Sequence, residues 1–165
     1  MLTMDEINRM SAEQFTAVLG WIFEDSPWVA EHAAAHRPFR SREALHRVMV
    51  LQVESAGISR QRALLCAHPD LGTRAKVSAV SAGEQAGAGL DRLTAEEYRS
   101  FQEWNRAYHA KFGFPFLYAV KGSTKQDIFA ALRLRLDSSP DEEFHRALTE
   151  VFRITWLRLE RAIAE

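Results

Sequence analysis

The chain has 165 residues, 47% of them hydrophobic, and a net charge of −1 from 21 basic and 22 acidic side chains. That length predicts one domain with a real core, and the absence of a basic excess argues against nucleic-acid or membrane-surface partners. The single cysteine, Cys66, excludes a disulfide within the chain and predicts a reducing, cytoplasmic location. We expect neither a secretory signal nor a membrane-spanning helix, since no apolar run approaches about 20 residues.

Apolar residues in the first part of the chain recur at helical spacing between recognisable helix ends. Serines before such runs predict N-caps, and Pro or Gly after them predicts ends. These signals predict helices from Ser11 through Ile22, from Pro27 to just before Pro38, from Arg42 to Ser55 with Gly57 as its stop, and from Ser59 to His68.

The second part of the chain begins with a predicted loop over residues 70–80. Thr94 and Glu97 form a predicted capping box, and Ser123 or Thr124 is the expected cap of a later helix. Four helices are predicted, over 81–90, 94–111, 125–136 and 140–162, with an extended or buried loop over 116–120. Because no alternating strand pattern occurs, the expected class is all-α: a compact single-domain bundle of about eight helices spanning residues 1–165.

Three short motifs hold the groups that a small-molecule site needs: His-Pro-Asp-Leu-Gly at 68–72, Ser-Ala-Gly-Glu-Gln at 81–85, and Lys-Phe-Gly-Phe-Pro-Phe at 111–116. They supply a titratable ring, a carboxylate, an amide and an apolar wall. His68 suits acid–base chemistry because its ring changes protonation state near neutral pH. Each motif also has a purely structural interpretation: His68 as a satisfied core residue, Ser81 with Glu84 as a capping box, and the phenylalanines as core.

The other reactive side chains point to neither a metal nor a nucleophile. His32 and His36 have the spacing of metal ligands but lack a third partner, so we expect solvated histidines. Cys66 lies two residues before His68, on another helix face, and is predicted to be a small core residue. An arginine of the last helix, Arg153 or Arg158, either buries its stem or clamps a carboxylate.

Along nearly its whole length the chain resembles the 2-oxo-4-hydroxy-4-carboxy-5-ureidoimidazoline (OHCU) decarboxylases. The resemblance rests on the three motifs in this order, and on Phe23–Trp28, Arg37–Phe39, Asn105, Tyr108, Ile154 and Arg158–Leu159. It implies an all-helical carboxy-lyase that needs no cofactor and no metal, converts OHCU to (S)-allantoin in urate (purine) degradation, and is often a homodimer. It implies catalytic roles for His68, Glu84 and Arg158, and substrate contacts at Pro69, Ser81, Gln85, Phe116, Leu117, Tyr118, Ala119 and Val120.

Two alternative functions stay open. One is a helical binding module that has the fold without the chemistry, which intact His68, Glu84 and Arg158 argue against. The other is a decarboxylase for a related ureido or imidazoline acid, for which Tyr118 and Trp156, both departures from the family's pattern, leave room. Activity toward OHCU separates the binding module from the decarboxylase, and a comparison of substrates separates the two decarboxylases.

Overall fold

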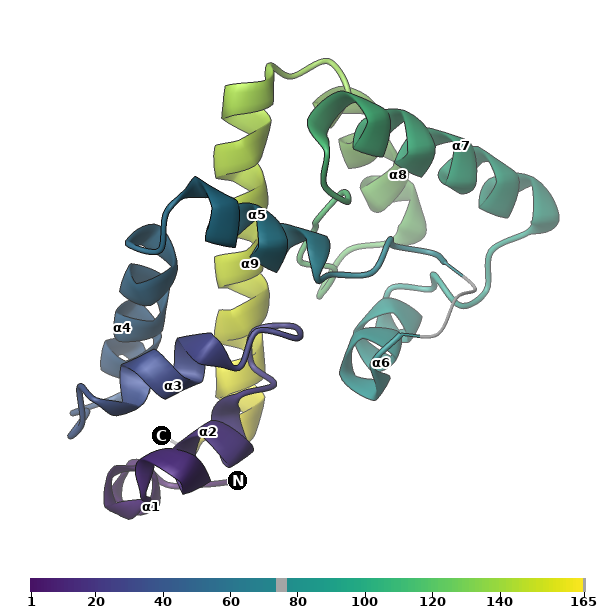
Figure 1. The fold of residues 1–165 in the computed structure, drawn as a ribbon. Coiled ribbons are helices and arrows are strands. Elements are labelled where there is room, and N and C mark those ends of the chain that lie inside the picture. The colour runs from purple at the N-terminus through teal and green to yellow at the C-terminus, as the bar shows by residue number, and fades with distance from the viewer. Residues whose placement is uncertain (74–76, 165) are drawn as a thin grey trace. The chain divides into compact units, whose positions relative to one another are not determined.

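The structure, a computed structural model, describes residues 1–73 and 77–164, and these residues form helices joined by turns and irregular segments (Figure 1). The only strand pairing among them is an isolated bridge between Leu2 and Ile163, so the all-α class is confirmed. Within the described residues the helices are α1 (Met4–Arg9), α2 (Ala12–Leu19), α3 (Trp28–Ala34), α4 (Arg42–Glu54), α5 (Ile58–Cys66), α6 (Ala79–Gly87), α7 (Ala95–Phe112), α8 (Lys125–Arg135) and α9 (Pro140–Ala162).

Side-chain caps begin four of the described helices where the sequence predicts them. The hydroxyls of Ser11, Ser41, Thr94 and Thr124 each accept a hydrogen bond from the backbone N–H three residues later, so Thr124 rather than Ser123 caps α8. The additional helix, α1, has the same device, because Thr3 accepts from the N–H of Glu6 and the Glu6 carboxylate accepts from that of Thr3. None of the described helices is long and apolar enough to cross a membrane.

Two predictions for the region around α5 are wrong. Gly57 does not end α4, which stops at Glu54; at φ +84° it is instead the N-cap of α5. Cys66 is exposed at the last turn of α5 and is not a core residue. Cys66 is small and follows Leu64 and Leu65 directly, which makes a core position plausible from the sequence. In the structure the two leucines are buried and Cys66 lies on the exposed side of the helix.

The chain divides into two compact units, and the first comprises Met1–Ala67 and Val151–Glu165. In it α2 packs against α3, and α3 against α4, as Figure 1 shows. The two chain ends lie side by side, since Leu2 donates to the carbonyl of Ala162 at 2.9 Å and accepts from the N–H of Ala164 at 2.8 Å. Its core is a set of almost fully buried side chains that includes Ile7, Phe15, Leu19, Ile22, Val29, Leu45, Met49 and Leu159.

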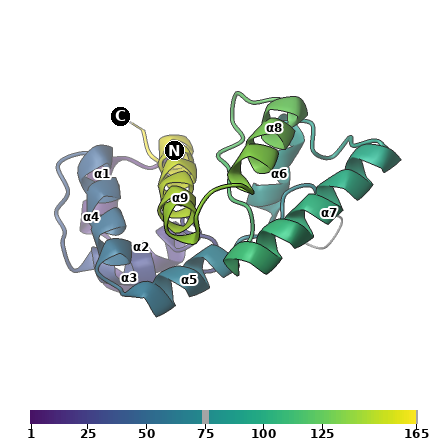
Figure 2. The ribbon, with the colours of Figure 1, turned by 90° about the horizontal axis from the view of Figure 1, so that it is seen from above.

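The second unit, His68–Glu150, contains α6, α7, α8 and the first part of α9. α7 lies against α8 in both views (Figures 1 and 2), and the Phe129 ring centroid is 4.8 Å from that of Phe101. Gly113 ends α7 in the left-handed conformation at φ +79°, which turns the chain into the buried segment that follows. The phenylalanines of the third motif, Phe112, Phe114 and Phe116, are core, with ring centroids 4.6, 6.0 and 5.4 Å from that of Tyr108.

Candidate active site

The first motif forms a buried turn immediately after α5. Pro69 disfavours helical geometry at His68, so the chain leaves the helix there, and His68 is only 7% exposed. Gly72 adopts φ +69°, and a Cβ at this position would lie 3.1 Å from side-chain carbons of Leu93 and Phe101. The turn therefore requires glycine both for its backbone conformation and for its close packing. Of the loop predicted over 70–80, residues 74–76 lie outside the described residues.

Two side-chain amides hold this turn in place. The N–H of Gly72 donates to Oε1 of Gln85 at 2.9 Å, and Nδ2 of Asn105 donates to the carbonyl of Leu71 at 3.0 Å. Both amides are buried, and they come from different helices, α6 and α7. The first motif is thus attached to the second through Gln85, and to α7 through Asn105.

The second motif lies inside α6, which begins earlier than predicted. Ser78 is the N-cap and its hydroxyl accepts from the N–H of Ser81, so the predicted Ser81–Glu84 capping box is wrong. Ser81 is instead the third helical residue and is 5% exposed. Residues three and four apart share a helix face, so Ser81, half-buried Glu84 and Gln85 lie together on the inner side of α6. Capping therefore does not account for Glu84.

The segment 116–120 is largely buried and lies outside any helix or strand, in keeping with the extended or buried loop that the sequence predicts. Leu117 accepts a hydrogen bond through its carbonyl from Nη1 of Arg135 at 2.6 Å, and the N–H of Ala119 donates to Oε2 of Glu150 at 2.9 Å. Tyr118 is half-buried, with its hydroxyl 3.0 Å from that of Ser123. Two backbone groups of the expected substrate segment are thus already bonded within the protein.

A buried ionic cluster lies behind this segment. Arg135 donates through Nε to Oε1 of Glu143 at 2.6 Å and pairs with the same carboxylate through Nη2, and the hydroxyl of Tyr108 also donates to Oε1. The guanidinium carbon lies 4.5 Å from the centroid of the Phe116 ring. Burial, reinforced by the hydrogen bond to Glu143, raises the pKa of Tyr108 well above its usual value, so the phenol stays neutral.

Arg135, Glu143 and Glu150 were missed as site-related residues, although the sequence carries a weak signal for Arg135. Arg135 continues the apolar face of α8 set by Ile128 and Leu132, with helical spacing of four and three. A charged side chain on an apolar face indicates a buried ion pair, because an isolated buried charge is strongly unfavourable. What the spacing cannot supply is the partner, which comes from α9.

Arg158 belongs to the first unit, where it is 1% exposed, whereas Arg153 is exposed. Its Nη2 lies 2.9 Å from Oε2 of Glu24, and its Nη1 donates to the carbonyl of Ile22 at 3.3 Å. Of the two candidate arginines, Arg158 is therefore the buried one. Glu24 was not predicted to be its partner, although it lies in the Phe23–Trp28 stretch on which the resemblance rests.

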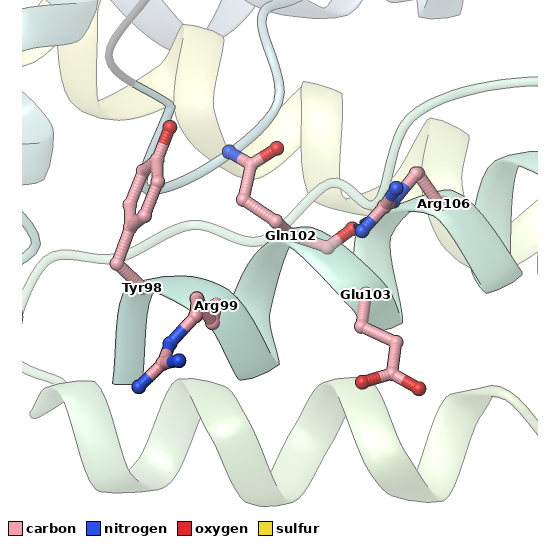
Figure 3. A pocket seen from close by; sticks show the side chains of 5 residues that line it. All are labelled: Tyr98, Arg99, Gln102, Glu103 and Arg106. Carbon is pink, nitrogen blue, oxygen red and sulfur yellow. Dashed lines mark hydrogen bonds between the residues drawn. The ribbon is translucent and has the colours of Figure 1, made fainter. Parts of the chain in front are cut away.

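The expected site residues are thus divided between the units: Arg158 lies in the first, and all the others lie in the second. Two open hollows hold none of them. One, of about 510 Å³, runs along α7 and is lined by Tyr98, Arg99, Gln102, Glu103 and Arg106 (Figure 3). The other, of about 420 Å³, is lined by Glu43, His46, Arg47, Val50 and Trp156. Among the described residues, no three His, Cys, Asp or Glu side chains are grouped so that they could hold a metal ion.

Comparison with known proteins shows what this chain is similar to. The sequence model of the OHCU decarboxylase family matches residues 8–160. A 2-oxo-4-hydroxy-4-carboxy-5-ureidoimidazoline decarboxylase of Haloferax volcanii is 45% identical over 158 residues, which are 96% of this chain and 94% of that protein. The uric acid degradation bifunctional protein PucL of Bacillus subtilis is 47% identical over the full chain, which spans only 33% of PucL.

The fold is similar to that of a solved relative as well. The crystal structure of (S)-allantoin synthase superposes with a TM-score of 0.83 at 30% sequence identity, covering 99% of this chain and 54% of that one. The family model, the Haloferax relative and the crystal structure of (S)-allantoin synthase each match nearly the whole length of this chain. On these grounds the protein belongs to the OHCU decarboxylase family.

Proposed function

We propose that the protein decarboxylates OHCU to (S)-allantoin without a cofactor, as a step of urate degradation. The observation that carries the proposal is the 45% identity over 94% of a relative named for this activity. The geometry supports it, because a buried histidine turn is bonded to the helix that presents Ser81, Glu84 and Gln85. The titratable ring and the carboxylate of the proposed chemistry thus belong to two directly connected elements.

The substrate's own chemistry explains why no cofactor is needed. OHCU carries a carboxylate and a hydroxyl on one ring carbon, and loss of CO₂ breaks the carbon–carboxylate bond and leaves its electron pair on that carbon. The adjacent C=N bond of the ring takes up the pair, so that a C=C bond forms between the hydroxyl-bearing and the ureido-bearing carbons. A proton then adds to the ureido-bearing carbon while the hydroxyl loses its proton and becomes the ring carbonyl, which gives allantoin. The protein has to hold the carboxylate out of the ring plane, stabilise the developing charge and let the proton reach one face only.

The proposed catalytic residues divide these tasks. His68 hydrogen-bonds the hydroxyl–carboxylate end of the substrate and takes part in the proton transfer. Glu84 binds the ureido or ring N–H groups, or sets the protonation of His68. Arg158 orients an anionic or carbonyl group, with Glu24 holding the guanidinium plane at 2.9 Å. All of these residues lie within the single catalytic domain proposed for residues 1–165.

The proposed substrate contacts follow from which groups the protein itself uses. Gln85 accepts from Gly72 through Oε1, so its NH₂ group is the part that donates to the substrate. Since the Leu117 carbonyl and the Ala119 N–H are already bonded to Arg135 and Glu150, the backbone groups of Tyr118 between them are the segment's proposed contact with the substrate. Ser81, Pro69 and the side chains of Phe116 and Val120 complete the proposed lining.

Two further expectations, a homodimer and a cytoplasmic location, belong with this proposal. A small-molecule substrate is supported by the names of the relatives, whereas the homodimer and the cytoplasmic location rest on the family resemblance and the single cysteine. Light scattering during gel filtration tests the dimer directly. A mass of one chain, 18.8 kDa, would exclude it.

The proposed activity is tested by a circular-dichroism time course. Urate, urate oxidase and hydroxyisourate hydrolase generate the short-lived substrate in place, and this protein is added last. We expect rapid growth of the signal of optically active (S)-allantoin, and its loss in a folded His68→Asn variant. Racemic product at the rate without enzyme would overturn the proposal and favour a related ureido acid or a binding module.

A further inference from the structure

We infer that Asn105 is a positioning residue for His68 and acts together with Gln85 through the peptide group between Leu71 and Gly72. The inference rests on the proposed function only for the role of His68. It goes beyond the catalytic set, because Asn105 touches a backbone carbonyl of the protein, and because it gives Gln85 a task other than contact with the substrate.

The two amides bind the two ends of one planar unit. The carbonyl of Leu71 accepts from Nδ2 of Asn105 at 3.0 Å, and the N–H of Gly72 donates to Oε1 of Gln85 at 2.9 Å. A peptide group is rigid and planar, so bonds at both its oxygen and its nitrogen fix its orientation as well as its position. Asn105 and Gln85 are 4% and 8% exposed, so water does not compete freely for either bond.

This peptide group lies three residues after His68, and the stretch that joins them is constrained at both of its ends. Pro69 has a fixed φ, and Gly72 is held in the left-handed region against Phe101 of α7. Any rotation of the Leu71–Gly72 peptide would therefore be transmitted to the backbone that carries the His68 ring. The amide pair sets where that ring lies.

The same pair also fixes His68 relative to α6. Gln85 follows Glu84 directly in the chain, so the bond from Gly72 ties the histidine turn to the helix that carries the proposed catalytic carboxylate. Loss of the Asn105 bond frees one end of the peptide and loosens this tie without removing any group that touches the substrate. We therefore expect slower catalysis with little change in substrate binding.

The test compares Asn105→Asp and Asn105→Ala with Phe112→Leu. The first variant has almost the same shape as the wild type but has no hydrogen to donate when its carboxylate is ionised, and the second buries no charge. Phe112 is buried in the same helix and packs on Tyr108 and Phe114, so Phe112→Leu weakens α7 at a position away from the turn. The measurements are the thermal midpoint, kcat and KM for substrate generated in place, and the NMR resonance of the His68 ring, assigned by its loss in His68→Asn.

We expect the Asn105 variants to lower kcat by roughly tenfold to a hundredfold with a smaller change in KM, and to shift the His68 resonance. Phe112→Leu should lower the thermal midpoint and leave kcat and the resonance near wild type. Equal kcat in the Asn105 and Phe112 variants with an unmoved resonance overturns the inference, and so does failure of both Asn105 variants to fold, which would make the role purely structural. If the wild type proved inactive toward OHCU while the Asn105 variants still shifted the His68 resonance, the positioning of His68 would be upheld and the proposed function overturned.

Discussion

Arg158 shows at the level of one residue how strongly burial constrains a proposed catalytic group. Its guanidinium is almost fully buried and pairs with Glu24 at 2.9 Å, and removal of one partner of a buried pair destabilises a protein by about 3–5 kcal/mol. We predict that Glu24→Gln lowers the free energy of unfolding by about 3 kcal/mol and reduces kcat, as measured by urea titration and by the dichroism assay.

Asp25→Asn is the matched control for that change. It makes the same chemical substitution at the next residue, whose side chain is exposed and whose φ of 42° an asparagine tolerates. We expect its stability to stay within about 0.5 kcal/mol of wild type. Equal losses of unfolding free energy in the two variants would mean that the buried carboxylate of Glu24 contributes no more to stability than the exposed one of Asp25.

His46 gives a prediction for pH. Its Nε2 lies 3.0 Å from the carbonyl of Phe152, which can only accept, so this nitrogen carries the hydrogen. Burial lowers the pKa of His46 below its usual value, and the hydrogen bond to Phe152 opposes this only in part. The unfolded chain therefore binds the proton first, and stability is lost as pH falls below about 6.5. We predict that the free energy of unfolding, measured by urea titration, falls less in His46→Gln than in wild type between pH 7.5 and pH 5.5. Equal losses in the two proteins would contradict this.

Ser81 and Glu84 show what local sequence leaves undecided. Ser78 and Ser81 both stand three residues before a helical N–H, and the Glu at 84 favours Ser81 as the cap. Burial decides the other way, because a start at Ala79 turns Ser81 and Gln85 inward together. The site residues themselves came from motifs and family resemblance, and their roles stay predictions.

At the level of elements, α8 and the first part of α9 hold the 116–120 segment through the Arg135–Glu143 pair. We predict that Arg135→Met lowers the free energy of unfolding by about 3–5 kcal/mol, because it leaves the Glu143 carboxylate buried without its cation. Adding Glu143→Gln should restore part of that loss, since the uncompensated charge is gone. Urea titration of the single and double variants measures this, and additive losses would contradict it.

Local signals predicted elements well and pairings poorly. The Thr94–Glu97 capping box, the expected cap at Ser123 or Thr124, and Pro140 placed α7, α8 and α9 to within a residue or two. α1 carries the same Thr-x-x-Glu signal in Thr3 and Glu6. The partners of Arg135 and Asn105 lie 8 and 34 residues away in other elements, so no helical period reveals them. Such contacts depend on how separate elements pack.

For the whole molecule, sequence predicted the all-α class and the family, and both are confirmed. It did not predict that α9 divides between two units at Glu150 and Val151, because that division follows from long-range packing. The consequence for function is specific. Arg158 shares a helix with Glu150, which supports the substrate segment, yet belongs to a different unit from every other proposed site residue.

If residues of both units serve one reaction, His68 and Arg158 depend on each other in catalysis. We predict that His68→Asn and Arg158→Lys each abolish most stereospecific turnover, and that the double variant is no slower than the worse single variant, because residues that act together are strongly non-additive. Lysine keeps the charge of Arg158 but not its planar fork, so the effect would report geometry. Arg153→Lys, an exposed position on the same helix, should keep near-wild-type activity. Initial rates of (S)-allantoin formation decide the matter, and losses that multiply in the double variant would mean that the two residues act independently.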